Sequence, residues 1–222
     1  PAPSPSFLGV TTLAKYPLTE LIERIDWTPF FQAWEMVGHF PAILDDPASG
    51  KTARSLYDDA LRLLERIVKE NLVEARGVFG FFPAASDGDD IVVYQDERRT
   101  TIRSTIHTLR SQSRKSGDRR NLALADFVAP VSSGVPDYIG LFAVTAGLGL
   151  DPLVAEFEAA NDDYSAIIAK ALADRLAEAF AERLHERVRK EFWGYAKDES
   201  LDNHALIHEK YLIFLAPFLL VL

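Results

Sequence analysis

An acidic residue followed by an aromatic residue is the first group in this sequence that could bind a ligand. Asp26 precedes Trp27, and a carboxylate beside an aromatic ring attracts cations through its charge and through the ring face. The same residues fit a structural role, in which Asp26 or Thr28 caps a helix with Pro29 in its first turn and Trp27 packs in the core. The pattern therefore leaves two interpretations, a cation-binding pocket and a capped helix.

Three further carboxylates lie on one stripe of a predicted long helix. Asp174, Glu178 and Glu182 recur at every fourth residue, and residues at this spacing are neighbours on a helix surface. Such a stripe could line the site of a positively charged ligand. The alternative is a solvated helix face whose charge is offset by nearby bases, namely Arg175, Arg183 and Arg187.

A pair of histidines has the spacing of metal ligands. His204 and His208 lie one helical turn apart, but a zinc-protease helix needs glutamate directly after its first histidine, where this chain has Ala205. We therefore expect no metal site here, and we interpret His185 with Glu186 as structural. The sequence also contains no Gly-x-Gly-x-x-Gly fingerprint, no Walker loop and no Gly-x-Ser-x-Gly elbow.

Basic residues are concentrated in one segment of the chain. Residues 98–120 contain eight arginines and lysines and one acid, Asp118, which gives a local charge of +7 in a chain of net charge −9. This segment could dock an acidic partner or phosphate groups. It could equally be a solvated connection around Gly117.

Length and composition predict one globular domain that would carry any of these groups. The chain has 222 residues, of which 48% are hydrophobic, and it has no cysteine, which excludes disulfides, thiolate metal sites and a cysteine nucleophile. Its 33 acids against 24 bases argue against nucleic acid as a partner. No apolar run reaches the length of a membrane span, so we expect a cytoplasmic protein without membrane contacts. Residues 1–6, rich in proline and serine, are expected to form a flexible tether.

Hydrophobic periodicity predicts a mixed α+β fold for residues 7–222. We expect helices over residues 18–25, a short segment after 28, 52–71, 101–113, 153–157, 162–193 and 203–211. We expect strands over residues 77–83, 91–94, 122–129 and 138–146, with the last two in central positions. In the longest helix, apolar residues recur every fourth position and drift around the helix axis, so this alanine-rich helix should contact several neighbours in turn.

A series of motifs runs through almost the whole chain in a fixed order. They include Ile25-Asp-Trp-Thr-Pro-Phe-Phe, Pro41-Ala-Ile-Leu-Asp-Asp-Pro, Ala75-Arg-Gly-Val-Phe-Gly-Phe-Phe-Pro-Ala, Gly88-Asp-Asp-Ile, Leu124-Ala-Asp-Phe-Val-Ala-Pro, residues 137–147, Asp162-Asp-Tyr, residues 170–190 and Trp193-Gly-Tyr-Ala. Together they resemble the activation domain of cobalamin-dependent methionine synthase. The resemblance extends from about Phe7 to Tyr211 and is most specific in the long helix.

This resemblance implies a fold and a function. The fold would be a single C-shaped α+β domain with a bent antiparallel sheet flanked by helices. The module would bind S-adenosylmethionine and, as part of a methyltransferase of methionine biosynthesis, support reductive methylation of cob(II)alamin. The implied partners are a separate cobalamin-binding domain and flavodoxin or a flavoprotein reductase. By position, Asp26, Trp27, Glu178 and Glu209 resemble residues of the S-adenosylmethionine site.

The C-terminus departs from the family pattern. After the last helix the family has a Gly-Ile-Arg-Pro-Ala-Pro-Gly-Tyr-Pro loop, whose arginine and backbone hold the ligand. Here residues 212–222 are apolar and only Ala216-Pro217 matches. This tail could pack on the core or form a dimer contact. It also leaves an alternative function, a non-catalytic module that docks on the cobalamin domain or on flavodoxin.

Overall fold

A long three-stranded antiparallel arrangement forms the centre of the protein. The computed structural model describes residues 3–114, 120–201 and 218–220, the last three by their backbone alone. Strand β2 (Glu74–Asp87) pairs along one edge with β5 (Asp137–Leu148). Its other edge pairs first with β1 (Gly9–Tyr16) and then with β3 (Asp90–Tyr94).

Two outer strands extend this sheet without closing it. Strand β4 (Ile102–His107) pairs antiparallel with β3, and the three-residue β6 (Phe218–Leu220) pairs parallel with β5. The predicted antiparallel pair 77–83 and 91–94 and the central strand 138–146 are thus confirmed. Three residues of the apolar tail form β6, and the rest of residues 212–222 lies outside the described part of the chain.

The helices pack mainly on one face of the sheet. The described helices are α1 (Thr19–Ile22), α2 (Trp27–Gln32), α3 (Gly50–Glu70), α4 (Leu150–Ala159) and α5 (Asp163–Arg187). Helix α5 continues as a π-helix over Val188–Phe192, which confirms the predicted long helix. It contacts β5, α4, α3, α1 and α2, so the drifting row of apolar residues does meet several neighbours. The predicted helix 203–211 lies outside the described residues.

Helix α5 packs tightly on the sheet near its middle. Phe180 is fully buried, and its ring stacks on Tyr16 with 4.4 Å between centroids. A Cβ atom at Gly77 of β2 would lie 2.9 Å from the Cζ atom of Phe180. The absent side chain at this glycine therefore lets the phenylalanine ring reach the strand.

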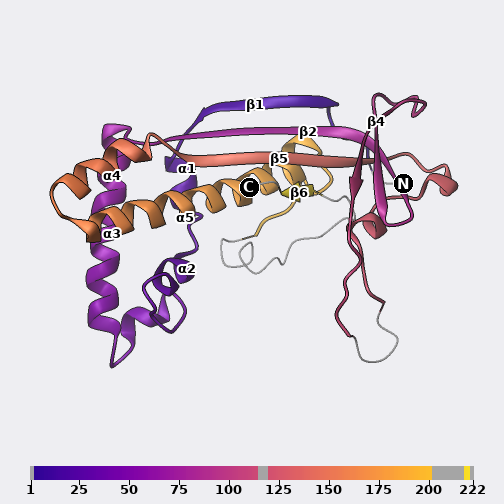
Figure 1. The fold of residues 1–222 in the computed structure, drawn as a ribbon. Coiled ribbons are helices and arrows are strands. Elements are labelled where there is room, and N and C mark those ends of the chain that lie inside the picture. The colour runs from indigo at the N-terminus through magenta and orange to yellow at the C-terminus, as the bar shows by residue number, and fades with distance from the viewer. Residues whose placement is uncertain (1–2, 115–119, 202–217, 221–222) are drawn as a thin grey trace.

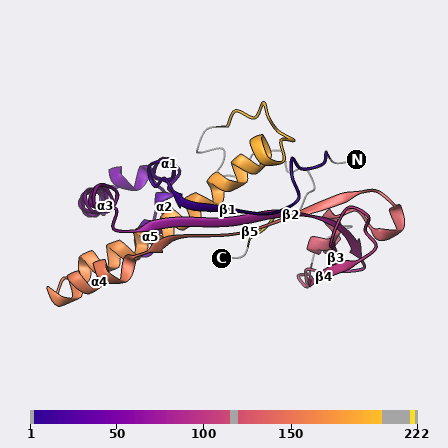
Figure 2. The same ribbon diagram turned by 90° about the horizontal axis from the view of Figure 1, so that it is seen from above.

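The ribbon views show how the elements are distributed along the sheet. Strands β1, β2 and β5 run side by side, and α5 lies along them (Figure 1). Helix α3 at one end and β4 at the other project to the same side as α5. The view from above places α3 and α4 at one end of the sheet and β3 and β4 at the other (Figure 2). The mixed α+β fold class is thereby confirmed.

Two predicted elements are wrong. Residues 101–113 are not helical, because 102–107 form β4, where Ile102, Thr105 and Ile106 complete the open edge of β3. Residues 122–129 are not a strand but contain a 3-10 helix, Leu124–Phe127. The Asp126 carboxylate accepts a hydrogen bond from the backbone N–H of Ala123 at 2.9 Å and closes this turn. Its apolar residues Ala125 and Val128 then cover the sheet face opposite α5.

The described part of the expected tether contacts the domain. The carbonyl of Pro3 accepts a hydrogen bond from the indole N–H of Trp193 at 2.6 Å. The backbone N–H of Ser6 donates to the carbonyl of Phe192 at 3.0 Å. Residues 3–6 thus lie against the C-terminal end of the long helix.

Candidate functional site

Asp26 and Trp27 begin α2 and hold it on the core. Asp26 is the N-cap residue, and its Oδ1 atom accepts a hydrogen bond from the Thr28 N–H at 2.9 Å. Trp27 is 6% exposed and makes edge contacts with the rings of Phe30 and Tyr57. The structural interpretation of this pair is confirmed. A role in ligand binding remains a prediction, for which Asp26 offers its Oδ2 atom, which has no hydrogen bond to the described residues.

Glu178 lies on α5 beside a buried arginine. The two terminal nitrogens of the Arg175 guanidinium, Nη1 and Nη2, donate to the Glu178 carboxylate at 2.6 and 2.7 Å. Arg175 also pairs with Asp174 at 2.6 Å, and its side chain is 8% exposed, whereas that of Glu178 is 51% exposed. Two carboxylates thus share one guanidinium, which leaves one net negative charge on this part of the helix.

The arginines of the predicted solvated face divide between different partners. Arg175 pairs with two carboxylates of the stripe, Asp174 and Glu178, as that interpretation requires. Arg183 instead pairs with Glu20 and Glu186, and Arg187 pairs with Glu191 at 2.9 Å. Within the stripe, Asp174 and Glu178 are therefore offset by one of these bases, Arg175.

Helix packing brings α2, which Asp26 caps, into contact with α5, which carries Glu178. Buried residues of α2, among them Phe30 and Phe31, belong to the same hydrophobic core as Leu176 and Ala179 of α5. The two candidate acids thus come from helices that contact each other. Glu209, the third candidate acid, lies outside the described residues, as do His204 and His208. Within the described ranges, no cluster of three or more metal-binding side chains is present.

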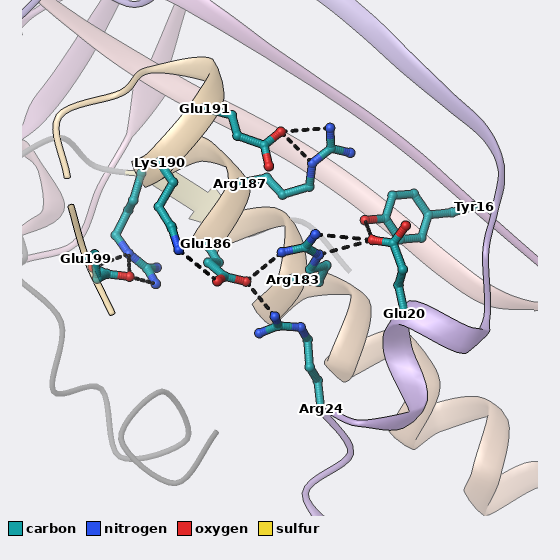
Figure 3. A network of polar contacts seen from close by, with 10 residues as sticks. Tyr16, Glu20, Arg24, Arg183, Glu186, Arg187, Lys190, Glu191 and Glu199 are labelled. Carbon is teal, nitrogen blue, oxygen red and sulfur yellow. Dashed lines mark hydrogen bonds and ion pairs between the residues drawn. The ribbon is translucent and has the colours of Figure 1, made fainter. Parts of the chain in front are cut away.

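A polar network joins α1 to α5 next to this region (Figure 3). The Tyr16 hydroxyl donates to the Glu20 carboxylate at 2.9 Å, and Arg183 donates to the same carboxylate at 3.2 Å. Arg183 also donates to Glu186 at 2.7 Å. Arg24, just after α1, reaches the same Glu186 oxygen at 2.8 Å. One continuous chain of contacts therefore runs from β1 through α1 to the C-terminal half of α5.

Glu186 is the centre of this network. Its side chain is 11% exposed and has three cationic neighbours, the third being Lys190 at 3.7 Å. Burial alone would raise the pKa of this carboxyl, but Arg183, Arg24 and Lys190 outweigh that effect and lower it. The hydrogen bond from Tyr16 lowers the pKa of Glu20 in the same way. Both carboxylates are accordingly held in the charged form at neutral pH.

His185 occupies an apolar environment on the sheet side of α5. Its ring meets the ring of Phe142 edge to face, with 5.2 Å between centroids. Burial, followed by the charge of Arg189, lowers the pKa of His185 to about 4. A neutral, packed histidine agrees with the structural role expected for His185.

Two arginines of the basic segment 98–120 contact acids or carbonyls from elsewhere in the chain. Arg110 pairs with Asp89 and Asp126, both at 2.6 Å, and lowers the pKa of Asp126 to about 2. Arg99 donates to the carbonyls of Ala84 and Asp137. Residues 115–119 lie outside the described part of the chain. Docking of an acidic partner on this segment remains a prediction.

The fold defines a mixed α+β module in which α2, capped by the candidate acid Asp26, contacts α5, which carries the candidate acid Glu178. The sequence from residue 17 to 214 matches the family described as vitamin B12 dependent methionine synthase, activation domain. The chain belongs to this family. Among the described residues, no helix is long and apolar enough to cross a membrane.

A solved structure supports the same family. The crystal structure of the MetH reactivation domain bound to AdoHcy is 51% identical in sequence to this chain, with a TM-score of 0.90. The match covers 95% of this chain and 64% of that one. The chain therefore spans a little under two thirds of the length of the protein that it matches.

The network around Glu186 was not anticipated from the sequence. Glu186 continues the stripe by one further step of four from Glu182, so its position on the helix was visible in the spacing. Nothing in the sequence indicated that Arg24 would pair with Glu186 or that Glu20 would pair with Arg183, because Glu20 and Arg24 lie near the opposite end of the chain.

Proposed function

We propose that this chain binds S-adenosylmethionine and supports the reductive methylation of cob(II)alamin that reactivates cobalamin-dependent methionine synthase. The observation that carries the proposal is the similarity to the AdoHcy-bound reactivation domain, at 51% identity over 95% of this chain. AdoHcy is what S-adenosylmethionine becomes when it loses its methyl group. The chain would thus be the reactivation module of a methyltransferase of methionine biosynthesis.

The candidate acidic residues of α2 and α5 suit this ligand. S-adenosylmethionine carries an ammonium group and a sulfonium, which supplies an electrophilic methyl group. Asp26 has a carboxylate oxygen without a hydrogen bond to the described residues, and the Asp174, Arg175 and Glu178 group has one net negative charge. We propose that Asp26 and Glu178 bind the positive part of the ligand and that Trp27 supports Asp26 from the core, with Glu209 as a further acid.

The chemistry asks the protein mainly to position two reactants. The described residues of the candidate site offer carboxylates that bind and orient a cation, and orientation of reactants alone lowers a barrier considerably. We propose that a separate domain holds the cobalamin and that flavodoxin or a flavoprotein reductase supplies the electron. The bent, C-shaped outline implied by the family would leave a concave side for this approach, since α3 and β4 project to the same side of the sheet (Figure 1).

The experiment that tests this function is calorimetric titration of the chain with S-adenosylmethionine, before and after Asp26→Asn. Asparagine caps a helix as well as aspartate does, so the variant removes the charge and keeps α2. Losing a hydrogen bond to a charged group costs about 1.5–3 kcal/mol, or about 10- to 150-fold in affinity. Unchanged affinity would exclude Asp26 from the site.

Asp162→Asn is the matched control. Asp162 caps α5 as Asp26 caps α2, with its carboxylate accepting from the Ser165 N–H at 3.0 Å. Because this cap is not a candidate ligand residue, the control should bind S-adenosylmethionine like the unaltered chain. An equal loss of affinity in both variants would assign the effect to helix capping.

Comparison of two ligands locates the charge that Asp26 meets. AdoHcy has the ammonium group but a neutral sulfur. If Asp26 faces the ammonium group, Asp26→Asn weakens both ligands equally, and if it faces the sulfonium, only S-adenosylmethionine is weakened. Similar titrations with Glu178→Gln separate the two acids.

The departure at the C-terminus motivates a second candidate function, docking without methyl-donor binding. Only β6 of the tail is described, and its pairing with β5 places it on the sheet. Pull-down with the cobalamin domain, with and without S-adenosylmethionine, distinguishes the two functions. Only the binding function predicts that the ligand changes the amount of complex.

A further inference from the structure

The ion pair between Arg24 and Glu186 connects the two elements that carry the proposed ligand residues. Arg24 precedes Asp26 by two residues, and Glu186 follows Glu178 by two turns of α5, about 12 Å along the helix axis. Their side chains meet at 2.8 Å and are 21% and 11% exposed. We propose that Arg24 and Glu186 are positioning residues, whose ion pair holds the Asp26 cap in place against α5 for binding of S-adenosylmethionine.

The backbone between Arg24 and Asp26 is fixed enough to transmit this constraint. The Arg24 N–H donates to the Leu21 carbonyl at 2.9 Å, and Ile25 is 4% exposed in the core. Asp26 then adopts an extended conformation, with φ −78° and ψ 110°, and caps α2. A change in the position of Arg24 is therefore passed directly to the Asp26 carboxylate.

The network gives the Arg24 side chain a defined orientation. Arg24 and Arg183 both contact the Oε2 atom of Glu186, while Lys190 approaches the other oxygen. Arg183 is itself held by Glu20 of α1. Polar contacts of this kind specify one geometry, because a buried charge without a partner is unfavourable.

Substitution of Arg24 and substitution of Glu186 remove different numbers of polar contacts from the network. In Arg24→Gln, Glu186 keeps Arg183 and Lys190 as partners, so α5 retains most of its polar contacts. In Glu186→Gln, three cations lose their shared carboxylate and repel one another. Arg24→Gln is therefore the first variant to measure, and Glu186→Gln is the second.

The test measures affinity and melting temperature together on the 222-residue chain. Arg24→Gln should weaken AdoHcy and S-adenosylmethionine by about five- to tenfold, the size of coupling between neighbouring sites. Arg24→Lys should restore part of the affinity. Arg66→Gln is the matched control. The Arg66 guanidinium lies 2.9 Å from the Glu156 carboxylate, and this ion pair joins α3 to α4 and does not involve α2. This control should leave affinity unchanged.

A double-mutant cycle shows whether Arg24 acts through Asp26. In the Asp26→Asn background, Arg24→Gln should change affinity less than twofold, because the group it positions is already altered. The proposal is overturned if Arg24→Gln lowers the affinity of the Asp26→Asn variant by as large a factor as it lowers that of the unaltered chain. It is also overturned if Arg24→Gln alone leaves the affinity unchanged. A lower melting temperature without loss of affinity also overturns it, since that is the effect of a purely structural ion pair.

This inference rests on the proposed function, and the same titrations distinguish their failures. If the unaltered chain binds neither ligand, the proposed function fails and the positioning role fails with it. If the unaltered chain binds and Asp26→Asn weakens binding while Arg24→Gln does not, only the positioning role fails.

Discussion

The contact between Gly77 and Phe180 determines how closely α5 approaches the sheet, and Gly77→Ala tests it. A Cβ atom at residue 77 would lie 2.9 Å from Cζ of Phe180 and 3.3 Å from Cγ1 of Val144, whereas carbon atoms prefer separations of about 3.5–4.0 Å. The phenylalanine ring cannot move away, because it is fully buried and stacked on Tyr16. Tyr16 is in turn hydrogen-bonded to Glu20.

We expect Gly77→Ala to lower the free energy of unfolding by about 1–2 kcal/mol. Overpacking a core typically costs about 1–3 kcal/mol, and the reduced freedom of the unfolded chain returns about 0.4–1 kcal/mol. For a domain of this size, the melting temperature should fall by about 2–8 °C. Thermal unfolding followed by circular dichroism measures it.

Gly147→Ala is the control for this prediction. A Cβ atom at residue 147 would lie 3.7 Å from the Cβ atom of Ala173 on α5, which is an ordinary contact. This variant should be neutral or slightly stabilising. If Gly77→Ala melts at or above the temperature of the unaltered chain, α5 does not lie as close to β2 as described. If the double variant of Gly77→Ala and Phe180→Leu loses less free energy of unfolding than the two single variants together, this result would support the contact.

Two further predictions concern buried charged and titratable groups. The pKa of His185 is lowered from 6.5 to about 4, so between these values the unfolded chain binds a proton that the folded chain does not. Acidification from pH 7 to 5 should therefore lower the free energy of unfolding, by up to about 1.4 kcal/mol per pH unit, and His185→Gln should flatten this dependence in urea titrations. The Arg189 and Glu199 side chains are 3% and 9% exposed and pair at 2.8 Å, so Arg189→Met should destabilise the fold by about 3–5 kcal/mol. Adding Glu199→Leu should recover part of that loss, and equal urea midpoints for the single and double variants would contradict this explanation.

Local patterns in the sequence predicted the parts of the fold that depend on local forces. The apolar period in residues 52–71 predicted α3, and Asp26 with Pro29 predicted the start of α2. The prediction failed for residues 102–107, where pairing with β3 decides the structure. It also failed at 122–129, where the Asp126 carboxylate closes a turn in an apolar run. In both cases a tertiary or side-chain hydrogen bond outweighs the propensity of the segment.

The candidate site could be predicted only residue by residue. Asp26 and Glu178 were found through the family resemblance and through helix spacing, but neither source indicates which residues hold them in position. The Arg24 and Glu186 contact joins distant parts of the chain. Such a pair becomes visible only when α1 is placed against α5.

The geometry of α5 implies that stability and affinity can be changed separately. Glu178 and Phe180 are two residues apart and therefore point in directions about 200° apart around the helix. Phe180 is fully buried, whereas the Glu178 side chain is 51% exposed. Gly77→Ala acts on the buried side and should lower the melting temperature with little change in ligand affinity. Arg24→Gln acts on the polar side and should show the opposite pattern. Parallel changes in both quantities for both variants would mean that the site depends on overall stability and not on the separate faces of α5.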